Sequence, residues 1–202
     1  MTGGSGGAGG AGGRTTSVLS VLTALTVLTF LTVPPVQAQI RAVVSEDPRV
    51  GSRAPGLVLP YVSADGAGAA PFDLVAELGR VVVLVFCPQL AEATCSAAWQ
   101  EWAGPDGGFG AGVSLVGVSG DQAWVAQEFA RASGTGARFL TDQRLVASRR
   151  WLAAREGRVA VFVVGPMGEV AYRDLQFFPS DSGAVGRLRG AVTEARGRAA
   201  GG

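Results

Sequence analysis

The sequence of 202 residues contains no histidine and only two cysteines. Without histidine, the protein cannot use Ser-His-Asp or Cys-His catalysis, and it cannot form zinc or copper sites with imidazole ligands. Two cysteines cannot form a four-thiolate metal site, and Cys87 and Cys95 stand eight positions apart, unlike a Cys-x-x-Cys redox pair. We therefore expect neither a metal nor another cofactor.

A dominant charge of one sign is also missing. The chain has 17 basic residues, all of them arginine, and 16 acidic ones, which gives a formal net charge of +1. No basic run is suited to a phosphate backbone, and the field around the protein is weak. Nucleic acid is therefore not an expected partner.

Residues 1–38 have the pattern of a glycine-rich tail followed by an export signal. An uncharged apolar run over residues 17–33 follows a basic residue and ends at two prolines, and small or aliphatic residues precede a cleavage point after Ala38. The alternative is a retained membrane anchor, because the run approaches the roughly 20 residues that span a bilayer. Both alternatives predict an extracytoplasmic protein, either secreted, periplasmic or membrane-associated through residues 17–33.

The remaining chain suits one domain with one core. Residues 39–49 form a lead-in, residues 50–197 form the domain, and residues 198–202 form a tail. Three runs are β-branched and apolar without alternation, as strands buried on both faces of a sheet are. We expect these runs to form adjacent central strands: Val81–Phe86, Val113–Ser119 and Val159–Val164.

Helical segments are expected between and after the strands. In these segments the apolar residues recur at helical spacing, or the segment directly follows a strand. The predicted helices are Ser96–Trp102, Asp121–Ala132, Gln143–Ala154 and Ala184–Arg196. A short edge strand is expected within Gly51–Pro60, a further strand at Arg138–Asp142, and a hairpin through Gly165–Gly168 into a strand at Glu169–Arg173. The order predicts the α/β class, with a central mixed β-sheet flanked by helices.

The segment Val81–Glu101 contains both cysteines and is the most informative part of the sequence. Pro88 cannot continue the buried strand, and the residues that follow indicate the first turns of a helix. Cys95 therefore falls at a helix N-terminus, where free amides and the helix dipole favour a thiolate. Cys95 is a candidate nucleophile, and the alternative is a small buried hydrophobic residue.

This segment resembles the active-site segment of peroxiredoxins, the alkyl hydroperoxide reductase and thiol-specific antioxidant family. The family pattern is Pro-x-x-x-Thr-x-x-Cys after a buried strand, and Pro88 and Cys95 stand at that spacing. Glu92 occupies the threonine position, while Thr94 directly precedes the cysteine. The resemblance covers roughly residues 50–196, including a Gly-x-x-Ala-Pro opening and a Phe-x-x-x-Pro-x-Gly hairpin, and it implies a thioredoxin-like sandwich.

The resemblance also implies roles for single residues. Cys95 would attack the peroxide, with Pro88, Glu92 and Thr94 beside it. The arginine that the family places at the start of a strand is offset here, because Val159 holds that position and Arg158 precedes it. Arg131, Arg149 and Arg150 are alternative cations, and the tryptophans Trp99, Trp102 and Trp151 are expected to pack the core or line the rim.

Cys87 is expected to pack at the end of its strand and to keep its proton, with a resolving role as the minority alternative. Gln100 stands where some peroxiredoxins carry a resolving cysteine, so a one-cysteine cycle is the simpler mechanism. An ionised Glu92 would disfavour a nearby thiolate unless an arginine pairs with it, and Arg158 is the first choice.

Three functions remain open. The first is an exported thiol peroxidase, with hydrogen peroxide or an organic hydroperoxide as substrate, an external thiol as reductant and a homo-oligomer as a possible assembly. The second is a catalytically degenerate thioredoxin-like module for binding or structure, for which Glu92 and Val159 argue. The third is a thiol-disulfide oxidoreductase, which the missing Cys-x-x-Cys pair disfavours.

Overall fold

The computed structural model describes residues 47–200, except residues 103 and 105–106. The expected export signal, the apolar run over residues 17–33 and most of the lead-in therefore lie outside the described residues. No helix in the described part is long and apolar enough to cross a membrane. The described elements are β1 (Val58–Leu59), β2 (Tyr61–Ser63), β3 (Gly66–Ala67), β4 (Phe72–Asp73), a 3-10 helix η1 (Leu74–Glu77), β5 (Val81–Cys87), α1 (Ala93–Glu101), β6 (Val113–Ser119), α2 (Ala123–Ser133), β7 (Arg138–Thr141), α3 (Val146–Arg150), β8 (Val159–Val164), β9 (Val170–Phe177) and α4 (Ser182–Ala200).

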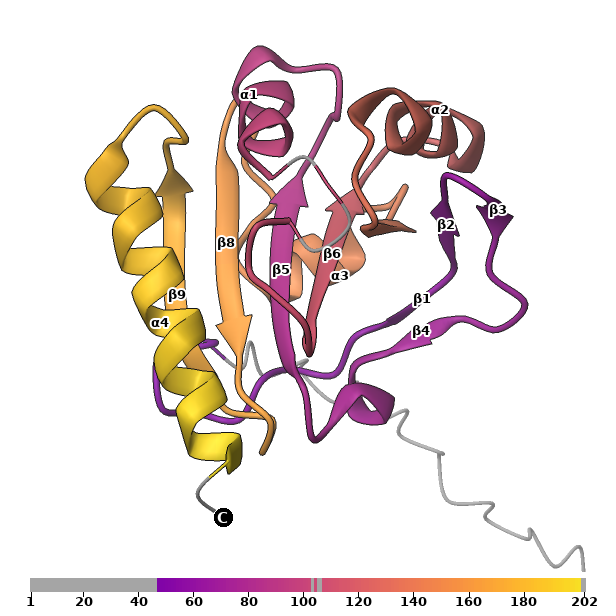
Figure 1. Cartoon of the computed structure of the whole chain (residues 1–202). Helices are drawn as coiled ribbons and strands as arrows, with labels where there is room; N and C mark the ends of the chain where they lie inside the picture. Colours follow the sequence, from indigo (N-terminus) through magenta and orange to yellow (C-terminus); the bar gives the residue numbers. More distant parts are fainter. Residues whose placement is uncertain (1–46, 103, 105–106, 201–202) are drawn as a thin grey trace, which may run out of the picture. The chain divides into compact units, whose positions relative to one another are not determined.

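A seven-stranded mixed sheet organises these elements, with the strand order β3-β2-β7-β6-β5-β8-β9. β5, β6 and β7 run parallel, while β8 runs antiparallel to β5. The arrows of β5, β6 and β8 in Figure 1 show these opposite directions. The three continuous apolar runs form β6, β5 and β8, which are neighbours at the centre of the sheet. Their prediction as adjacent central strands is confirmed.

The two faces of β5 build two separate hydrophobic clusters, because successive side chains of a strand point to opposite faces. Val83, Val85 and Cys87 join one cluster with Trp99 and Trp102 of the α1 region. The alternate residues of β5, Val82, Leu84 and Phe86, join the other cluster. In that cluster the ring centroid of Trp151 lies 5.6 Å from that of Phe86 and 5.0 Å from that of Phe162. Trp99, Trp102 and Trp151 are fully buried, as expected of core residues.

The predicted helix Gln143–Ala154 is too long. Only α3 is helical there, because Leu145 before it and Leu152 after it adopt left-handed backbone conformations, with φ of 52° and 57°. The Asp142 side chain accepts hydrogen bonds from the amides of Val146 and Ser148 and so fixes the start of this short helix. Local polar contacts therefore override the helical pattern of the sequence.

Other boundaries also differ from the predicted ones. The cysteine helix begins at Ala93, earlier than predicted, and the last helix continues past Arg196 to Ala200. The predicted edge strand within Gly51–Pro60 is reduced to β1, whereas the strand after the hairpin extends to Phe177. Helix and strand ends depend on caps and pairing partners that the sequence pattern does not contain.

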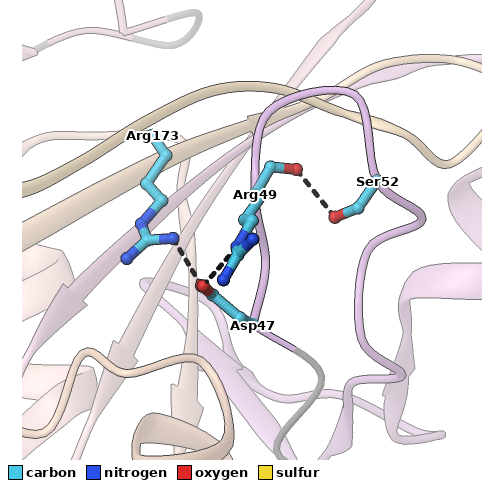
Figure 2. A network of polar contacts seen from close by, with 4 residues as sticks. All are labelled: Asp47, Arg49, Ser52 and Arg173. Atoms are coloured by element: carbon cyan, nitrogen blue, oxygen red, sulfur yellow. Dashed lines mark hydrogen bonds and ion pairs between the residues drawn. The ribbon is translucent and has the colours of Figure 1, made fainter.

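Asp47, the first described residue, is attached to the sheet through a small polar network (Figure 2). Its carboxylate binds the Nε of Arg49 at 2.6 Å and the Nη1 of Arg173, on β9, at 2.5 Å. The hydrogen bond from Arg49, followed by the contact with Arg173, holds the pKa of Asp47 below its ordinary value of 3.8, against the opposing effect of desolvation. The network therefore connects the beginning of the domain to an outer strand.

Replacing Arg49 with glutamine is expected to raise the pKa of Asp47 toward its ordinary value of 3.8, because the Arg49 hydrogen bond is the largest single cause of the shift. A folded-state pKa below the unfolded one stabilises the fold above the unfolded pKa, and this contribution is lost as the pH falls through the folded pKa. Titration of the carboxyl carbon by NMR measures the pKa. An unchanged value in the Arg49 variant would contradict this assignment.

Candidate functional site

Both cysteines lie at one edge of the sheet, where the parallel strands end. Cys87 ends β5 and pairs in register with Ser119 at the end of β6, which in turn pairs with Thr141 at the end of β7. The carboxyl edge of parallel strands is where α/β proteins commonly build their sites. Cys95 is brought to the same edge because a short loop leads directly from β5 into α1 (Figure 1).

Cys87 and Cys95 are joined by a disulfide, with their Cα atoms 5.9 Å apart. The expectation that Cys87 only packs at the strand end and keeps its proton therefore does not describe this structure. The sequence spacing does not indicate the bond, because the fold brings the strand end and the helix start together. Each cysteine residue is 1% exposed.

Cys95 is the third residue of α1, as the sequence predicts for a cysteine at a helix start. Glu92 stands at the N-cap with extended backbone angles, and its side chain makes no capping hydrogen bond. In the reduced protein, the first-turn amides and the helix dipole would favour a thiolate at Cys95. Thr94, the residue before Cys95, is half-buried in the same turn.

Glu92 does not have the arginine partner that we expected. Its Oε2 accepts a hydrogen bond of 3.0 Å from the backbone amide of Gly157, and within the described chain it forms no ion pair with Arg158. The bond reaches across 65 positions of sequence and attaches the loop before β8 to the start of α1. Because Gly157 is next to Arg158, the contact brings the entry of β8 beside the cysteine helix.

Arg158 is half-buried immediately before β8, and its Nη1 is buried with no hydrogen-bond partner among the described residues. The pairing of β8 with β9 is irregular between Val159 and Val161. An arginine one position before the family's arginine would face the opposite side of a regular strand, so it needs such an irregularity to reach the site. Arg131 instead donates to the carbonyl oxygen of Ala64 at 3.0 Å, in the turn between β2 and β3. Of the candidate cations, Arg158 is therefore the one that the contact between Glu92 and Gly157 places near the start of α1.

Ser119 and Asp121 belong to the site, although they were not predicted from the sequence. Oδ2 of Asp121 accepts from the amide of Leu90 and from Oγ of Ser119, both at 2.7 Å. The Pro88 carbonyl accepts from the amide of Gly120 at 3.1 Å. The Ser-Gly-Asp sequence at the end of a buried strand was the available signal. These contacts fix the loop between the two cysteines.

A family model described as the AhpC/TSA family matches residues 50–173, more than half of the chain. The chain belongs to the AhpC/TSA family. This assignment agrees with the peroxiredoxin pattern at Pro88 and Cys95. A search of the curated proteins found no match to the sequence.

Solved structures of peroxiredoxins share the fold. The reduced 2-Cys peroxiredoxin of Plasmodium vivax is 19% identical with a TM-score of 0.57, covering 73% of this chain and 98% of that one. The peroxidoxin BcpB of Mycobacterium tuberculosis is 19% identical with a TM-score of 0.59, covering 72% and 97%. The bacterioferritin comigratory protein of Xanthomonas campestris is 18% identical with a TM-score of 0.54, covering 68% and 92%. These similarities confirm the thioredoxin-like fold of this AhpC/TSA protein.

Proposed function

We propose that the protein is a thiol peroxidase that reduces hydrogen peroxide or an organic hydroperoxide through Cys95. The observation that carries the proposal is the position of Cys95 in the first turn of α1, at the carboxyl edge of the sheet and in an AhpC/TSA chain. The Xanthomonas campestris relative is described as having alkyl peroxide reduction activity. That description supports the substrate class proposed here.

In the proposed reaction, the Cys95 thiolate attacks one peroxide oxygen. A sulfur–oxygen bond forms, the oxygen–oxygen bond breaks, and the leaving alkoxide or hydroxide takes a proton to become an alcohol or water. First-turn amides of α1 would stabilise the thiolate. The Nη1 of Arg158, which has no hydrogen-bond partner among the described residues, is a donor for the departing oxygen. Pro88, buried at the end of β5, keeps the loop before α1 out of the ladder.

An external thiol is the proposed reductant, and the proposed location is outside the cytoplasm. The export pattern of residues 1–38 supports this location, although these residues lie outside the described part. The Cys87–Cys95 disulfide is also compatible with an oxidising compartment, where such bonds persist. Retention of residues 17–33 as a membrane anchor and assembly into a homo-oligomer stay predictions.

A second candidate function is a binding or structural module. The burial of both sulfur-bearing side chains favours it, because a disulfide that no reagent reaches can serve only to fix α1 on β5. Glu92 in place of the family's threonine favours it as well. The two functions differ in one property, the reactivity of Cys95 in the reduced protein.

Sulfenic-acid trapping in a Cys87→Ser variant tests the proposal. The fully reduced variant is given a peroxide pulse and then dimedone, and tryptic mass spectrometry locates the label. The peroxidase function predicts a label on Cys95, because this variant has no second thiol to consume the sulfenic acid. The reciprocal Cys95→Ser variant should leave Cys87 unlabelled. If the folded Cys87→Ser protein stays unlabelled, the peroxidase function is wrong and the binding or structural module is the better proposal.

Replacing Glu92 with glutamine should speed the reaction of reduced protein with peroxide roughly fivefold. The change removes a negative charge beside the thiolate, an effect on the order of 1 kcal/mol in a partly exposed site, and keeps an oxygen to accept from Gly157. Glu92→Thr removes the same negative charge and should also react faster than the wild type. Stopped-flow measurement of peroxide consumption gives the rates, and equal rates for glutamine and wild type would contradict the charge argument.

A further inference from the structure

The disulfide and the intact helix coexist in the structure. With Cys95 bonded to Cys87, α1 still begins at Ala93, and the amide of Ser96 donates to the carbonyl of Glu92 at 2.9 Å. β5 likewise keeps its pairing with β6 as far as Cys87. The Cα separation of 5.9 Å lies within the range that a disulfide spans without backbone movement, about 4.4–6.8 Å. The bond therefore needs no unwinding of the elements that carry it.

We propose that Cys87 is the resolving thiol of the reaction, and that the loop over residues 88–92 controls reduction of the disulfide. The proposal rests on the proposed peroxidase function. No other cysteine exists in the sequence, so a sulfenic acid at Cys95 has Cys87 as its one intramolecular thiol. Resolution from the end of the preceding strand replaces the one-cysteine cycle expected from the sequence.

The resolving step conserves atoms and electrons. The Cys87 sulfur attacks the sulfur of Cys95 sulfenic acid, the sulfur–sulfur bond forms, and the hydroxyl leaves as water with the Cys87 proton. One peroxide is reduced by two electrons, and both thiols are oxidised to one disulfide. An external dithiol then reduces this disulfide by exchange and becomes a disulfide itself.

An external thiol must approach one of two sulfurs whose residues are 1% exposed. The loop that connects the cysteines contributes Leu90, which is also 1% exposed and belongs to the same hydrophobic cluster as both cysteines. Thiol exchange needs direct attack on a sulfur atom. Reduction of the disulfide by an external thiol therefore requires the loop to move, whereas the bond between the two sulfurs forms without unwinding β5 or α1.

Three polar contacts hold this loop closed, and each joins it to a different distant residue. Its carbonyl at Pro88 and its carboxylate at Glu92 bind the amides of Gly120 and Gly157, respectively. The central contact is the 2.7 Å hydrogen bond from the amide of Leu90 to Asp121, whose carboxylate is itself fixed by Ser119. Asp121 is therefore a positioning residue that sets how readily the loop opens.

The resolving role is tested by counting thiols in fully reduced wild-type protein after one equivalent of hydrogen peroxide, with dimedone present. We expect both thiols to be lost, an intramolecular disulfide to form and Cys95 to stay unlabelled, whereas Cys87→Ser should be labelled at Cys95. Wild-type protein with labelled Cys95 and a free Cys87 thiol would overturn the resolving role and leave the peroxidase intact. An unlabelled Cys95 in Cys87→Ser would overturn the peroxidase itself.

The role of the loop is tested by the rate at which dithiothreitol reduces the disulfide of the folded protein. Asp121→Ala should raise this rate roughly tenfold, because it removes a hydrogen bond to a charged acceptor at the centre of the loop. Asp65→Ala, at an exposed turn, is the matched control and should reduce at the wild-type rate. Leu90→Ala, which weakens the loop from its apolar side, provides a second variant should Asp121→Ala not fold. Wild-type reduction rates in a folded loop variant would overturn the role of the loop.

Discussion

Replacing Cys95 with serine is expected to abolish peroxide reduction. A serine hydroxyl stays protonated at neutral pH even at a helix N-terminus, so the thiolate attack on the peroxide oxygen is lost. Turnover measured with dithiothreitol as reductant should fall by at least about two orders of magnitude, to the rate of the thiol alone. The full-length chain is used, with the disulfide reduced at the outset.

Cys87→Ser provides the matched control, because it removes the same disulfide from the same two elements. Both variants therefore share any cost in stability, and a difference in activity between them reports chemistry alone. Cys87→Ser should still reduce its first equivalent of peroxide. Equal loss of activity in both variants would show that the fold of the site, and not the thiolate of Cys95, was lost.

The position of Cys95 could be predicted because it depends on neighbours in sequence. A buried strand, a proline that ends it and a helical pattern after it place the cysteine in a first helical turn, where the structure has it. The central strands could be predicted for a similar reason, since each is apolar on both faces. Such features are carried by a few consecutive residues.

The contacts that complete the site could not be predicted, because each joins residues that are distant in sequence. Glu92 binds Gly157 across 65 positions, and Leu90 binds Asp121 across 31. Charge alone suggested an arginine for Glu92, yet a backbone amide satisfies it. The disulfide was not predicted because two residues eight positions apart can lie close together or far apart, depending on how the strand and the helix meet.

A second large effect is expected at Gly117, in the middle of β6. A Cβ at this position would lie 2.7 Å from Cδ1 of Phe139 and 2.9 Å from Cζ2 of Trp99. Both rings are fully buried and pack together with centroids 4.7 Å apart, so neither has free space to enter. Gly117→Ala should therefore lower the free energy of unfolding by about 1–3 kcal/mol through overpacking, measured by urea denaturation of the oxidised protein.

The cysteine helix should also respond to this change, because Trp99 lies one turn after Cys95 in α1. Gly186→Ala in α4 is the control, since it is the same substitution at an exposed helical position where a Cβ meets nothing within 4 Å. That variant should be more stable by about 0.5–1 kcal/mol, because alanine is the better helix former. Opposite signs of the change in the free energy of unfolding for the two variants would show that the close approach of β6 to Trp99 and Phe139, and not glycine replacement in general, sets the cost of the substitution. If both variants were stabilised, Trp99 would have room to move and α1 would not depend on this contact.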